Sequence, residues 1–157
     1  MIYPIARDLP GTLSTMPAPL GGAGLDDALA ELRAQGVDMV VSLLPPGQAA
    51  ALELDGEAAA AARAGLGFRS LPIDDFGVPD RDAFAAPLRA LGAALDDGQH
   101  LAIHCWAGIG RSSLVAAALL VLRGDDPATA WDRVAAGRGV PVPETEAQRR
   151  WVYGLTP

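Results

Sequence analysis

The sequence predicts a single α/β domain over residues 1–157, in which helices flank a central, mostly parallel, twisted sheet. Short runs of β-favouring, apolar residues alternate with longer stretches in which apolar residues recur at helical spacing. A chain of 157 residues, 50% of them hydrophobic, is long enough to bury one sizeable core and short for two. No linker, internal repeat or long low-complexity tract divides it.

The first half of the chain alternates helices and strands. Apolar residues at helical spacing before Gly36 predict a helix over 25–35, and the apolar run 37–44, closed by two prolines, predicts a buried strand. The alanine-rich residues 48–64 favour one long helix that ends before Gly65. Residues 68–73 are then expected to form the next strand.

The second half continues the alternation. Asp80 is a candidate N-cap for a helix whose apolar residues, from Phe84 to Leu95, lie on one side. The elements expected after it are a strand at 101–104, a buried central helix at 112–122, where nearly every residue is apolar, a helix at 127–136 with proline in its first turn, and a helix from 143 or 144 through Trp151.

The charges disfavour nucleic acid and membrane as partners. The chain has 12 basic and 19 acidic residues, a net charge of -7, and a negative surface repels phosphate backbones and anionic headgroups. No apolar run reaches about 18 residues, so we expect a cytoplasmic protein. Every basic residue is arginine, which favours a bacterial source with a GC-rich genome.

Cys105 is the only cysteine, and it is either a filler of the core or a nucleophile. It has no partner for an internal disulfide, and one cysteine with two histidines does not form a zinc site of the usual composition. We therefore expect no metal and no cofactor. The neighbours of Cys105 decide between the two interpretations.

Those neighbours predict an anion-binding loop. Cys105 leaves an expected strand and enters a loop with Gly108 and Gly110, after which Arg111 and Ser112 begin the buried helix. Glycines let backbone amides face inward, and inward amides at a helix N-terminus bind anions. Arg111 adds a planar guanidinium that can bind two phosphate oxygens. The same positive environment favours a thiolate on Cys105, and Ser112 is placed to donate a hydrogen bond to its sulfur.

The run His-Cys-Trp-Ala-Gly-Ile-Gly-Arg-Ser over 104–112 resembles the signature of the cysteine-dependent protein tyrosine phosphatase superfamily: His-Cys, five residues, Arg, then Ser or Thr. From about 9 to 152 the chain is similar to the compact dual-specificity branch, particularly the cyclin-dependent-kinase-associated phosphatases and their bacterial relatives, in which residues 9–14 correspond to the opening strand. The resemblance implies that the chain hydrolyses a phosphorylated protein or a small phosphomonoester through a phosphocysteine on Cys105. It further implies a phosphate site formed by Trp106, Ala107, Gly108, Ile109, Gly110 and Arg111, with His104 supporting the loop.

This mechanism needs a general acid, and Asp75 is the candidate. Asp75 lies in a glycine/proline turn after an expected strand, and the run 74–79 looks like the family's mobile acid loop. The thirty residues from Asp75 to Cys105 suffice for the helix and strand of a right-handed crossover, which returns the chain to the same end of the sheet. Asp74 is the alternative acid, Asp80 is expected to be a helix cap, and all three could instead be turn and cap carboxylates.

Several polar and aromatic residues have two interpretations. Residues 142–148 resemble the family's glutamine-containing segment, which implies that Gln148 orients the hydrolytic water; otherwise it is a helix-surface glutamine behind an N-cap at Thr145. Trp106 either lines the rim of the pocket or packs beneath it. His100 is expected in a solvated turn, and Trp131 and Trp151 are expected to pack in the core.

Two other functions use parts of the same pattern. An inactive relative that only binds phosphorylated partners would keep Arg111 but lose the nucleophile or the acid, and a thiolate-dependent sulfurtransferase would not need Asp75. The presence of both Cys105 and Asp75 favours the phosphatase. The residues between Cys105 and Arg111 are uncharged, which disfavours a highly phosphorylated lipid headgroup as substrate.

Overall fold

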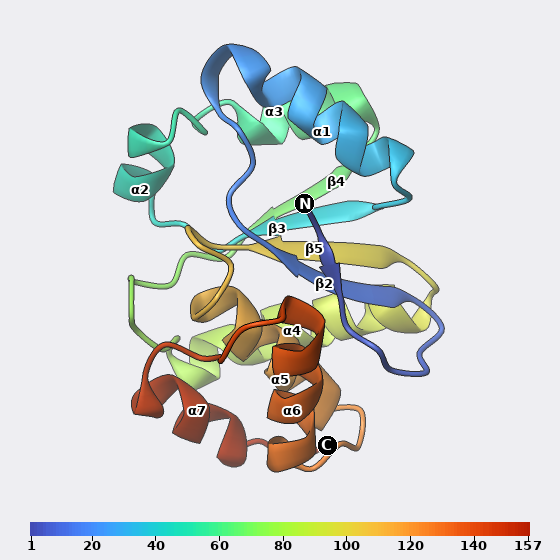
Figure 1. Ribbon diagram of the computed structural model, residues 1–157, viewed down its shortest axis with the longest axis vertical. Coiled ribbons are helices and arrows are strands. Elements are labelled where there is room, and N and C mark those ends of the chain that lie inside the picture. Colours follow the sequence, from blue (N-terminus) through green and yellow to red (C-terminus); the bar gives the residue numbers. More distant parts are fainter.

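One five-stranded sheet organises the molecule in the computed structural model, which describes all residues 1–157 (Figure 1). The strand order is β1-β2-β5-β3-β4, and every neighbouring pair is parallel except β1 with β2 at one edge. The predicted α/β class with a mostly parallel sheet is confirmed. The strands are β1 (Tyr3–Pro4), β2 (Thr12–Met16), β3 (Met39–Ser42), β4 (Gly67–Ser70) and β5 (His100–His104).

Helices cover both faces of this sheet (Figure 1). Two apolar clusters result, the smaller under α1 and α3 and the larger under α4 to α7. The first face carries a short 3-10 turn (Gly22–Gly24), α1 (Leu25–Ala34), α2 (Pro46–Ala51) and α3 (Glu57–Ala64). The second carries α4 (Arg81–Asp96), α5 (Arg111–Val121), α6 (Pro127–Arg138) and α7 (Glu146–Tyr153). None of these helices is both long and apolar enough to span a membrane.

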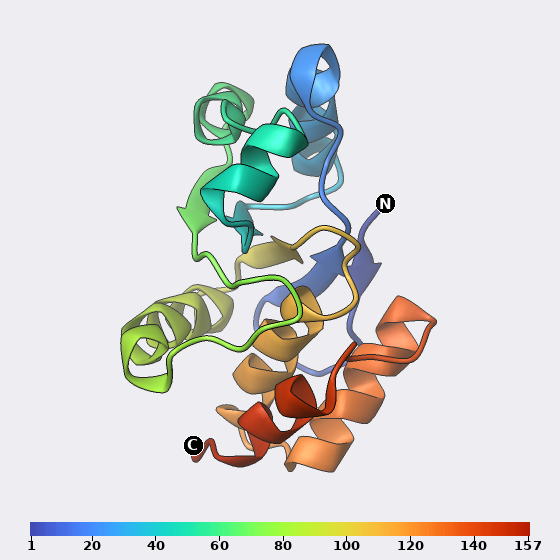
Figure 2. The same ribbon diagram turned by 90° about the vertical axis from the view of Figure 1, so that its left-hand side faces the viewer.

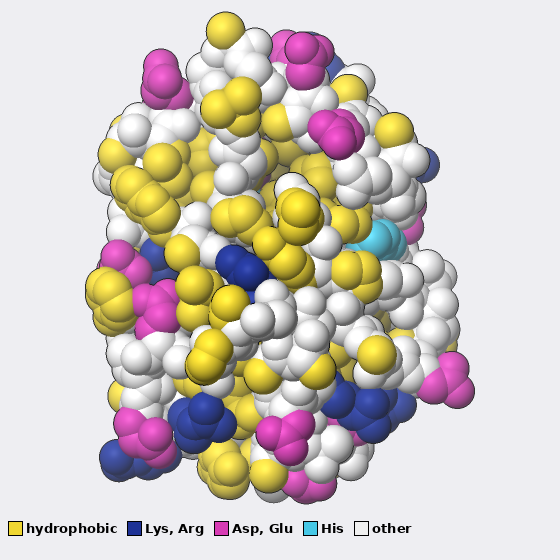
Figure 3. Space-filling model, viewed as in Figure 1, with side chains coloured by type: hydrophobic (Ala, Val, Ile, Leu, Met, Phe, Trp, Pro, Cys, Tyr) yellow, Lys and Arg dark blue, Asp and Glu magenta, His cyan; other side chains and the backbone are white.

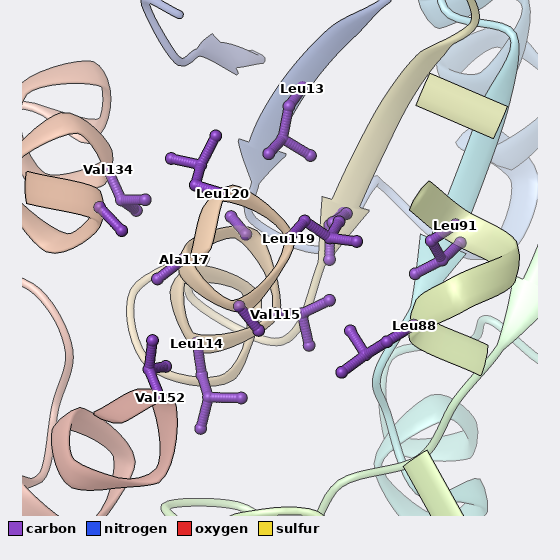
Figure 4. Packing of buried hydrophobic residues seen from close by; sticks show 14 of the residues in the cluster. Leu13, Leu88, Leu91, Leu114, Val115, Ala117, Leu119, Leu120, Val134 and Val152 are labelled. Atoms are coloured by element: carbon purple, nitrogen blue, oxygen red, sulfur yellow. The ribbon is translucent and has the colours of Figure 1, made fainter. Parts of the chain in front are cut away.

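Helix α5 is the centre of the larger cluster (Figure 4). All eleven of its residues are buried, as the apolar pattern predicted. Its side chains meet Leu13 of β2, Leu88 and Leu91 of α4, Val134 of α6 and Val152 of α7 (Figure 4). A helix packed on every side is held rigidly, so its amino end at Arg111 has a fixed place at the carboxyl edge of the sheet.

The prediction of one helix over 48–64 is wrong, because the chain forms two helices there, α2 and α3. Between them Glu53 adopts a left-handed conformation with φ of 56°, and Leu54 is buried in the smaller cluster. Burial of Leu54 therefore outweighs the helix propensity of the neighbouring alanines. The break leaves α2 beside the carboxyl end of β3, whereas α3 packs next to α1.

Most other expected elements differ only at their ends. Strand β4 ends at Ser70 instead of residue 73, although the backbone N–H of Leu71 still donates to Ser42 of β3, and that of Ile73 donates to Leu43 directly after β3. Pro72 between them has no N–H to donate. Asp80 caps α4 by accepting the N–H of Ala83 at 2.9 Å, as predicted.

His100 does not lie in a solvated turn, and that expectation is wrong. It is the first residue of β5, it is half-buried, and its Nε2 lies 2.8 Å from Oγ of Ser14 on β2. Burial lowers the pKa of His100 below its ordinary value of 6.5, although the neighbouring carboxylate of Asp38 partly opposes this shift.

Candidate active site

The loop that joins β5 to α5 turns its carbonyl oxygens outward. The oxygen of Trp106 accepts the N–H of Ala18 at 3.0 Å, and those of Ala107 and Gly108 accept from the Arg138 guanidinium at 3.2 and 3.0 Å. Because C=O and N–H point in opposite directions across a planar trans peptide, the N–H groups that follow these carbonyls face the other side of the loop. No backbone N–H from 106 to 110 donates a hydrogen bond within the protein, so these groups can bind an anion.

Gly108 permits this turn. Its φ is +72°, a left-handed value that favours glycine, and a Cβ atom there would lie 2.6 Å from the backbone carbon of Met16. The loop therefore needs glycine at this position both for its backbone conformation and for its close contact with the end of β2.

Cys105 and Ser112 come together at the amino end of α5. The Sγ of Cys105 lies 3.5 Å from the Oγ of Ser112, and Cys105 is almost completely buried. The positive end of a helix and a nearby hydroxyl both stabilise a thiolate. Cys105 is thus part of the core and also has the surroundings of a nucleophile, so the two interpretations of this residue do not exclude each other.

Arg111 extends from α5 toward the cavity with its guanidinium buried. Its Nη1 donates to Oε1 of Gln48 at 2.7 Å and to the carbonyl oxygen of Ile73 at 3.0 Å. Its Nη2 forms an ion pair with Oδ1 of Asp75 at 3.1 Å. These contacts fix the plane of the guanidinium, which is the group suited to bind two oxygens of a phosphate.

Asp75, and not Asp74, makes the contact with Arg111. Besides the ion pair, Oδ2 of Asp75 accepts from Nε2 of Gln48 at 3.3 Å, and 41% of the Asp75 side chain is exposed. The segment that carries it crosses in front of the amino end of α5, between α2 and α7 (Figures 1 and 2). The side chain of Asp74 makes no hydrogen bond and does not line the cavity.

A cavity of about 260 Å³ opens over this cluster. Trp106 lies at its rim with 43% of its surface exposed, whereas the side chain of Ile109 packs against the core, so Ile109 can contribute only its backbone to a phosphate site. The lining residues are Gln48, Asp75, Phe76, Trp106, Ala107, Arg111 and Glu144.

Gln148 is buried and its amide is already engaged. Its Oε1 accepts the N–H groups of Glu144 and Thr145 at 3.1 and 3.2 Å, which completes a capping box with Thr145 at the start of α7. Its Nε2 donates to the carbonyl oxygen of Gly77 at 3.3 Å. Gln148 therefore joins α7 to the segment of Asp75, and it does not lie on the helix surface.

His104 faces away from the cavity, inside the protein. Its Nδ1 lies 3.0 Å from the carbonyl oxygen of Cys105, and its Nε2 lies 2.7 Å from Oε1 of Glu57, which is also buried. Since a carbonyl oxygen only accepts, Nδ1 carries the proton. The two contacts hold the imidazole ring, and through it the peptide group of Cys105, in one orientation.

Four residues that contribute to the site were not identified from the sequence. For Gln48 a signal existed, because it follows a proline-terminated strand and so lies at the carboxyl edge of the sheet, where open α/β sheets bind ligands. No local pattern distinguishes the others. They are Glu57, which contacts His104, Arg138, which binds the carbonyl oxygens of the loop, and Glu144, which lines the cavity.

No cluster of three or more His, Cys, Asp or Glu side chains with a metal-binding arrangement occurs in the molecule.

In a comparison with known protein families, one family model matches most of this chain. The model described as "Tc-R-P: Polymorphic toxin system, DSP-PTPase phosphatase" matches residues 14–125, which is more than half of the chain. Cyclin-dependent kinase inhibitor 3 from Rattus norvegicus and from Sus scrofa are each 34% identical to the chain over 84 residues. That match covers 52% of this chain but only 40% of each relative, so the chain corresponds to less than half the length of these curated relatives.

Solved structures share the whole fold. Kinase-associated phosphatase, crystallised with its catalytic-site cysteine replaced by serine, matches with a TM-score of 0.85 at 21% identity over 98% of this chain and 92% of the other. The active form of Tk-PTP matches with a TM-score of 0.74 at 27% identity over 97% of both chains. TpbA of P. aeruginosa in complex with pTyr gives 0.63 at 25% identity over 97% of this chain and 89% of the other.

Proposed function

The chain belongs to the DSP-PTPase phosphatase family, and from this premise we propose that it is a cysteine-dependent protein-tyrosine or dual-specificity phosphatase. The observation that carries the proposal is the convergence of four groups from two distant segments: Cys105, Arg111 and Ser112 around the anion-binding loop, and Asp75 at 3.1 Å from the Arg111 guanidinium. TpbA, a structural relative, was solved with phosphotyrosine, which supports a phosphorylated protein or a small phosphomonoester as substrate.

In the first step the phosphate binds the loop amides and the Arg111 guanidinium, and it replaces Asp75 on that guanidinium. The thiolate of Cys105 attacks phosphorus in line while the equatorial oxygens stay bound to the amides and Arg111. Asp75, protonated and released at the rim of the cavity, gives its proton to the leaving oxygen. The products are the phosphocysteine and the free hydroxyl of the substrate.

In the second step a water molecule attacks the phosphocysteine, and Asp75 takes the proton of that water as general base. Ser112 donates a hydrogen bond to the sulfur as it leaves. We assign Gln148 to positioning the Asp75 segment instead of the water, because its oxygen already accepts two backbone N–H groups. His104 supports the loop through the Cys105 carbonyl oxygen.

We propose further that residues 1–157 act as one catalytic domain, because the Asp75 segment and the Cys105 loop meet at one edge of a single sheet. The cytoplasmic location and the bacterial source expected from the sequence stay predictions.

The test is hydrolysis of p-nitrophenyl phosphate in the presence of a metal chelator. Cys105→Ser is expected to reduce activity to background, because the hydroxyl of serine is a far weaker nucleophile than a thiolate. Asp75→Asn is expected to lower kcat by about 100-fold or more and to weaken the basic limb of the pH profile.

Asp74→Asn is the matched control, because it removes the same charge one residue away and Asp74 does not line the cavity. It is expected to keep kcat within about threefold of the wild type, as for a surface substitution. A Cys105→Ser variant with full activity would show the mechanism to be wrong. Loss of activity in Asp74→Asn but not in Asp75→Asn would assign the role of general acid to Asp74 instead of Asp75.

A further inference from the structure

The charges around the catalytic cavity are unbalanced toward negative. Among its lining residues Arg111 is the only cation, whereas Asp75 and Glu144 are both carboxylates. Asp75 already pairs with Arg111, but none of the nine ion pairs in the molecule involves Glu144. When a phosphate occupies Arg111, no other cation among the lining residues can pair with the carboxylate of Glu144 at the rim.

The position of Glu144 is defined by its surroundings. Its backbone N–H donates to the buried Gln148 at 3.1 Å, and the next residue, Thr145, is the N-cap of α7. Its carboxylate lies against the Cys105 loop, since a Cβ atom on Gly110 would be 2.8 Å from Oε1 of Glu144. Glu144 is also exposed, so its carboxylate faces both the phosphate site and the solvent beyond it.

Two aromatic side chains share this rim. Phe76 is 60% exposed and Trp106 is 43% exposed, and both line the cavity together with Glu144. Figure 3 shows acidic side chains (magenta) and a basic one (dark blue) next to hydrophobic ones (yellow) at the left-hand edge of the molecule, at the height of the segment between β4 and α4 in Figure 1. A carboxylate beside aromatic faces is a suitable surrounding for a guanidinium, which forms bidentate bonds with the first and stacks on the second.

We propose that the substrate is a protein segment with one phosphorylated residue flanked by arginine or lysine, and that Glu144 selects it. This inference rests on the proposed phosphatase function. The basic side chain pairs with the Glu144 carboxylate while the neighbouring phosphate occupies Arg111 and the loop amides. A second phosphate, or an acidic flanking residue, meets the unpaired carboxylate and is repelled, and the net charge of -7 acts in the same direction.

Three otherwise identical phosphotyrosine peptides, with arginine, glutamine or glutamate on both sides of the phosphotyrosine, test this selection. For the wild type at low ionic strength we expect kcat/KM to be about 10-fold higher for the arginine than for the glutamate peptide, in the range of one or two exposed ion pairs. In Glu144→Gln this ratio is expected to fall to about threefold or less, and in Glu144→Arg it is expected to invert.

Glu146→Gln is the matched control. It removes the same charge two residues away, at a side chain that does not line the cavity and lies 3.8 and 3.9 Å from Arg150 and Arg149. The ratio is expected to stay at the wild-type value. If the ratio falls as much in Glu146→Gln as in Glu144→Gln, the preference comes from net charge alone and the role of Glu144 is overturned. A wild type that hydrolyses all three peptides equally well would also overturn it.

The outcome for the proposed function can be read separately. If the wild type hydrolyses neither p-nitrophenyl phosphate nor any of the peptides, the phosphatase proposal fails. The affinity of Cys105→Ser for the three peptides then tests the selection alone. Tighter binding of the arginine peptide supports the role of Glu144, and equal binding contradicts it.

Discussion

Among the residues of the Cys105 loop, Gly108 is expected to tolerate substitution least. Alanine there would hold a left-handed backbone, which costs about 1–2 kcal/mol, and would also place Cβ 2.6 Å from the backbone of Met16. We expect Gly108→Ala to lower the free energy of unfolding by at least about 2 kcal/mol and to abolish phosphatase activity, because the loop amides lose their arrangement. Urea denaturation and p-nitrophenyl phosphate turnover measure the two effects.

Gly124→Ala separates backbone strain from the steric clash. Gly124 also has a positive φ, +102°, but no atom lies within 4 Å of an added Cβ. Its substitution is expected to cost only the strain, about 1–2 kcal/mol, and to leave kcat unchanged. If Gly108→Ala and Gly124→Ala behave alike in both measurements, the contact with Met16 does not constrain the loop.

His100 links stability to pH. Burial lowers its pKa below the ordinary value of 6.5, so the unfolded chain takes up a proton at a pH where the folded chain does not. The stability that the fold has with a neutral His100 is fully present above about pH 6.5. It is lost as the pH falls from there through the lowered pKa of His100 in the folded state. Between about pH 8 and about pH 5 the free energy of unfolding is thus expected to fall more in the wild type than in His100→Gln, which cannot take up this proton. The measurement is urea denaturation of both proteins at a series of pH values. An equal fall in the free energy of unfolding in the two proteins would contradict this link.

Separation along the chain explains which residues of the site were found from the sequence. Cys105, Arg111 and Ser112 lie within one short run, so their spacing alone predicted a loop that binds an anion beside a thiol. Glu57 and Arg138 hold the same loop from 47 and 30 residues away, and they meet it only in the folded protein. A buried glutamate within an alanine-rich helix leaves no periodic signal of such a contact.

At the scale of elements, α7 holds the segment that carries Asp75. Gln148 and Trp151, three residues apart on one face of α7, donate to the carbonyl oxygens of Gly77 and Pro79 at 3.3 and 3.0 Å. Periodicity could predict that a helix lies here, and the capping box could mark its start. It could not predict the partner of the helix, because that contact joins positions about seventy residues apart.

Trp151→Phe tests this connection, because it keeps a ring in the core and removes the hydrogen bond to Pro79. Leaving the buried carbonyl oxygen unsatisfied is expected to destabilise the protein by about 1–3 kcal/mol. We expect about 1 kcal/mol of this loss to be felt in the placement of Asp75 at the cavity, which lowers kcat about fivefold. The measurements are thermal unfolding and kcat for p-nitrophenyl phosphate.

Trp131→Phe is the control for that change. The Nε1 of Trp131 on α6 also donates to a backbone carbonyl oxygen, that of Arg149 at 3.3 Å, but this contact does not reach the Asp75 segment. We expect a similar loss of stability with kcat unchanged. A drop in kcat of equal size in both variants would attribute the effect to general loosening of the core.

At the scale of the whole molecule, the fold brings four distant segments to one edge of the sheet. Gln48 comes from α2, Asp75 from the segment after β4, Arg111 from α5, and Glu144 from the turn before α7. The alternation of elements predicted this edge, because the carboxyl ends of parallel strands lie together. The place of α2 depends on the break at Leu54, so the contact of Gln48 with Arg111 could not follow from helix propensity.

Because residues from all four segments line one cavity, an oxyanion bound there is expected to stabilise the whole fold. At a concentration of tungstate about 100 times its Kd the free energy of unfolding rises by about 2.7 kcal/mol, which is roughly 5–10 °C in Tm for a chain of this size. Asp75→Asn removes the carboxylate that competes for Arg111, so it is expected to show a larger rise than the wild type although its turnover is lower. Arg111→Met, compared with and without tungstate, is expected to show almost none. An equal rise in Tm for all three proteins would mean that the oxyanion binds outside the Cys105 loop, and the assignment of Arg111 to the phosphate would then be wrong.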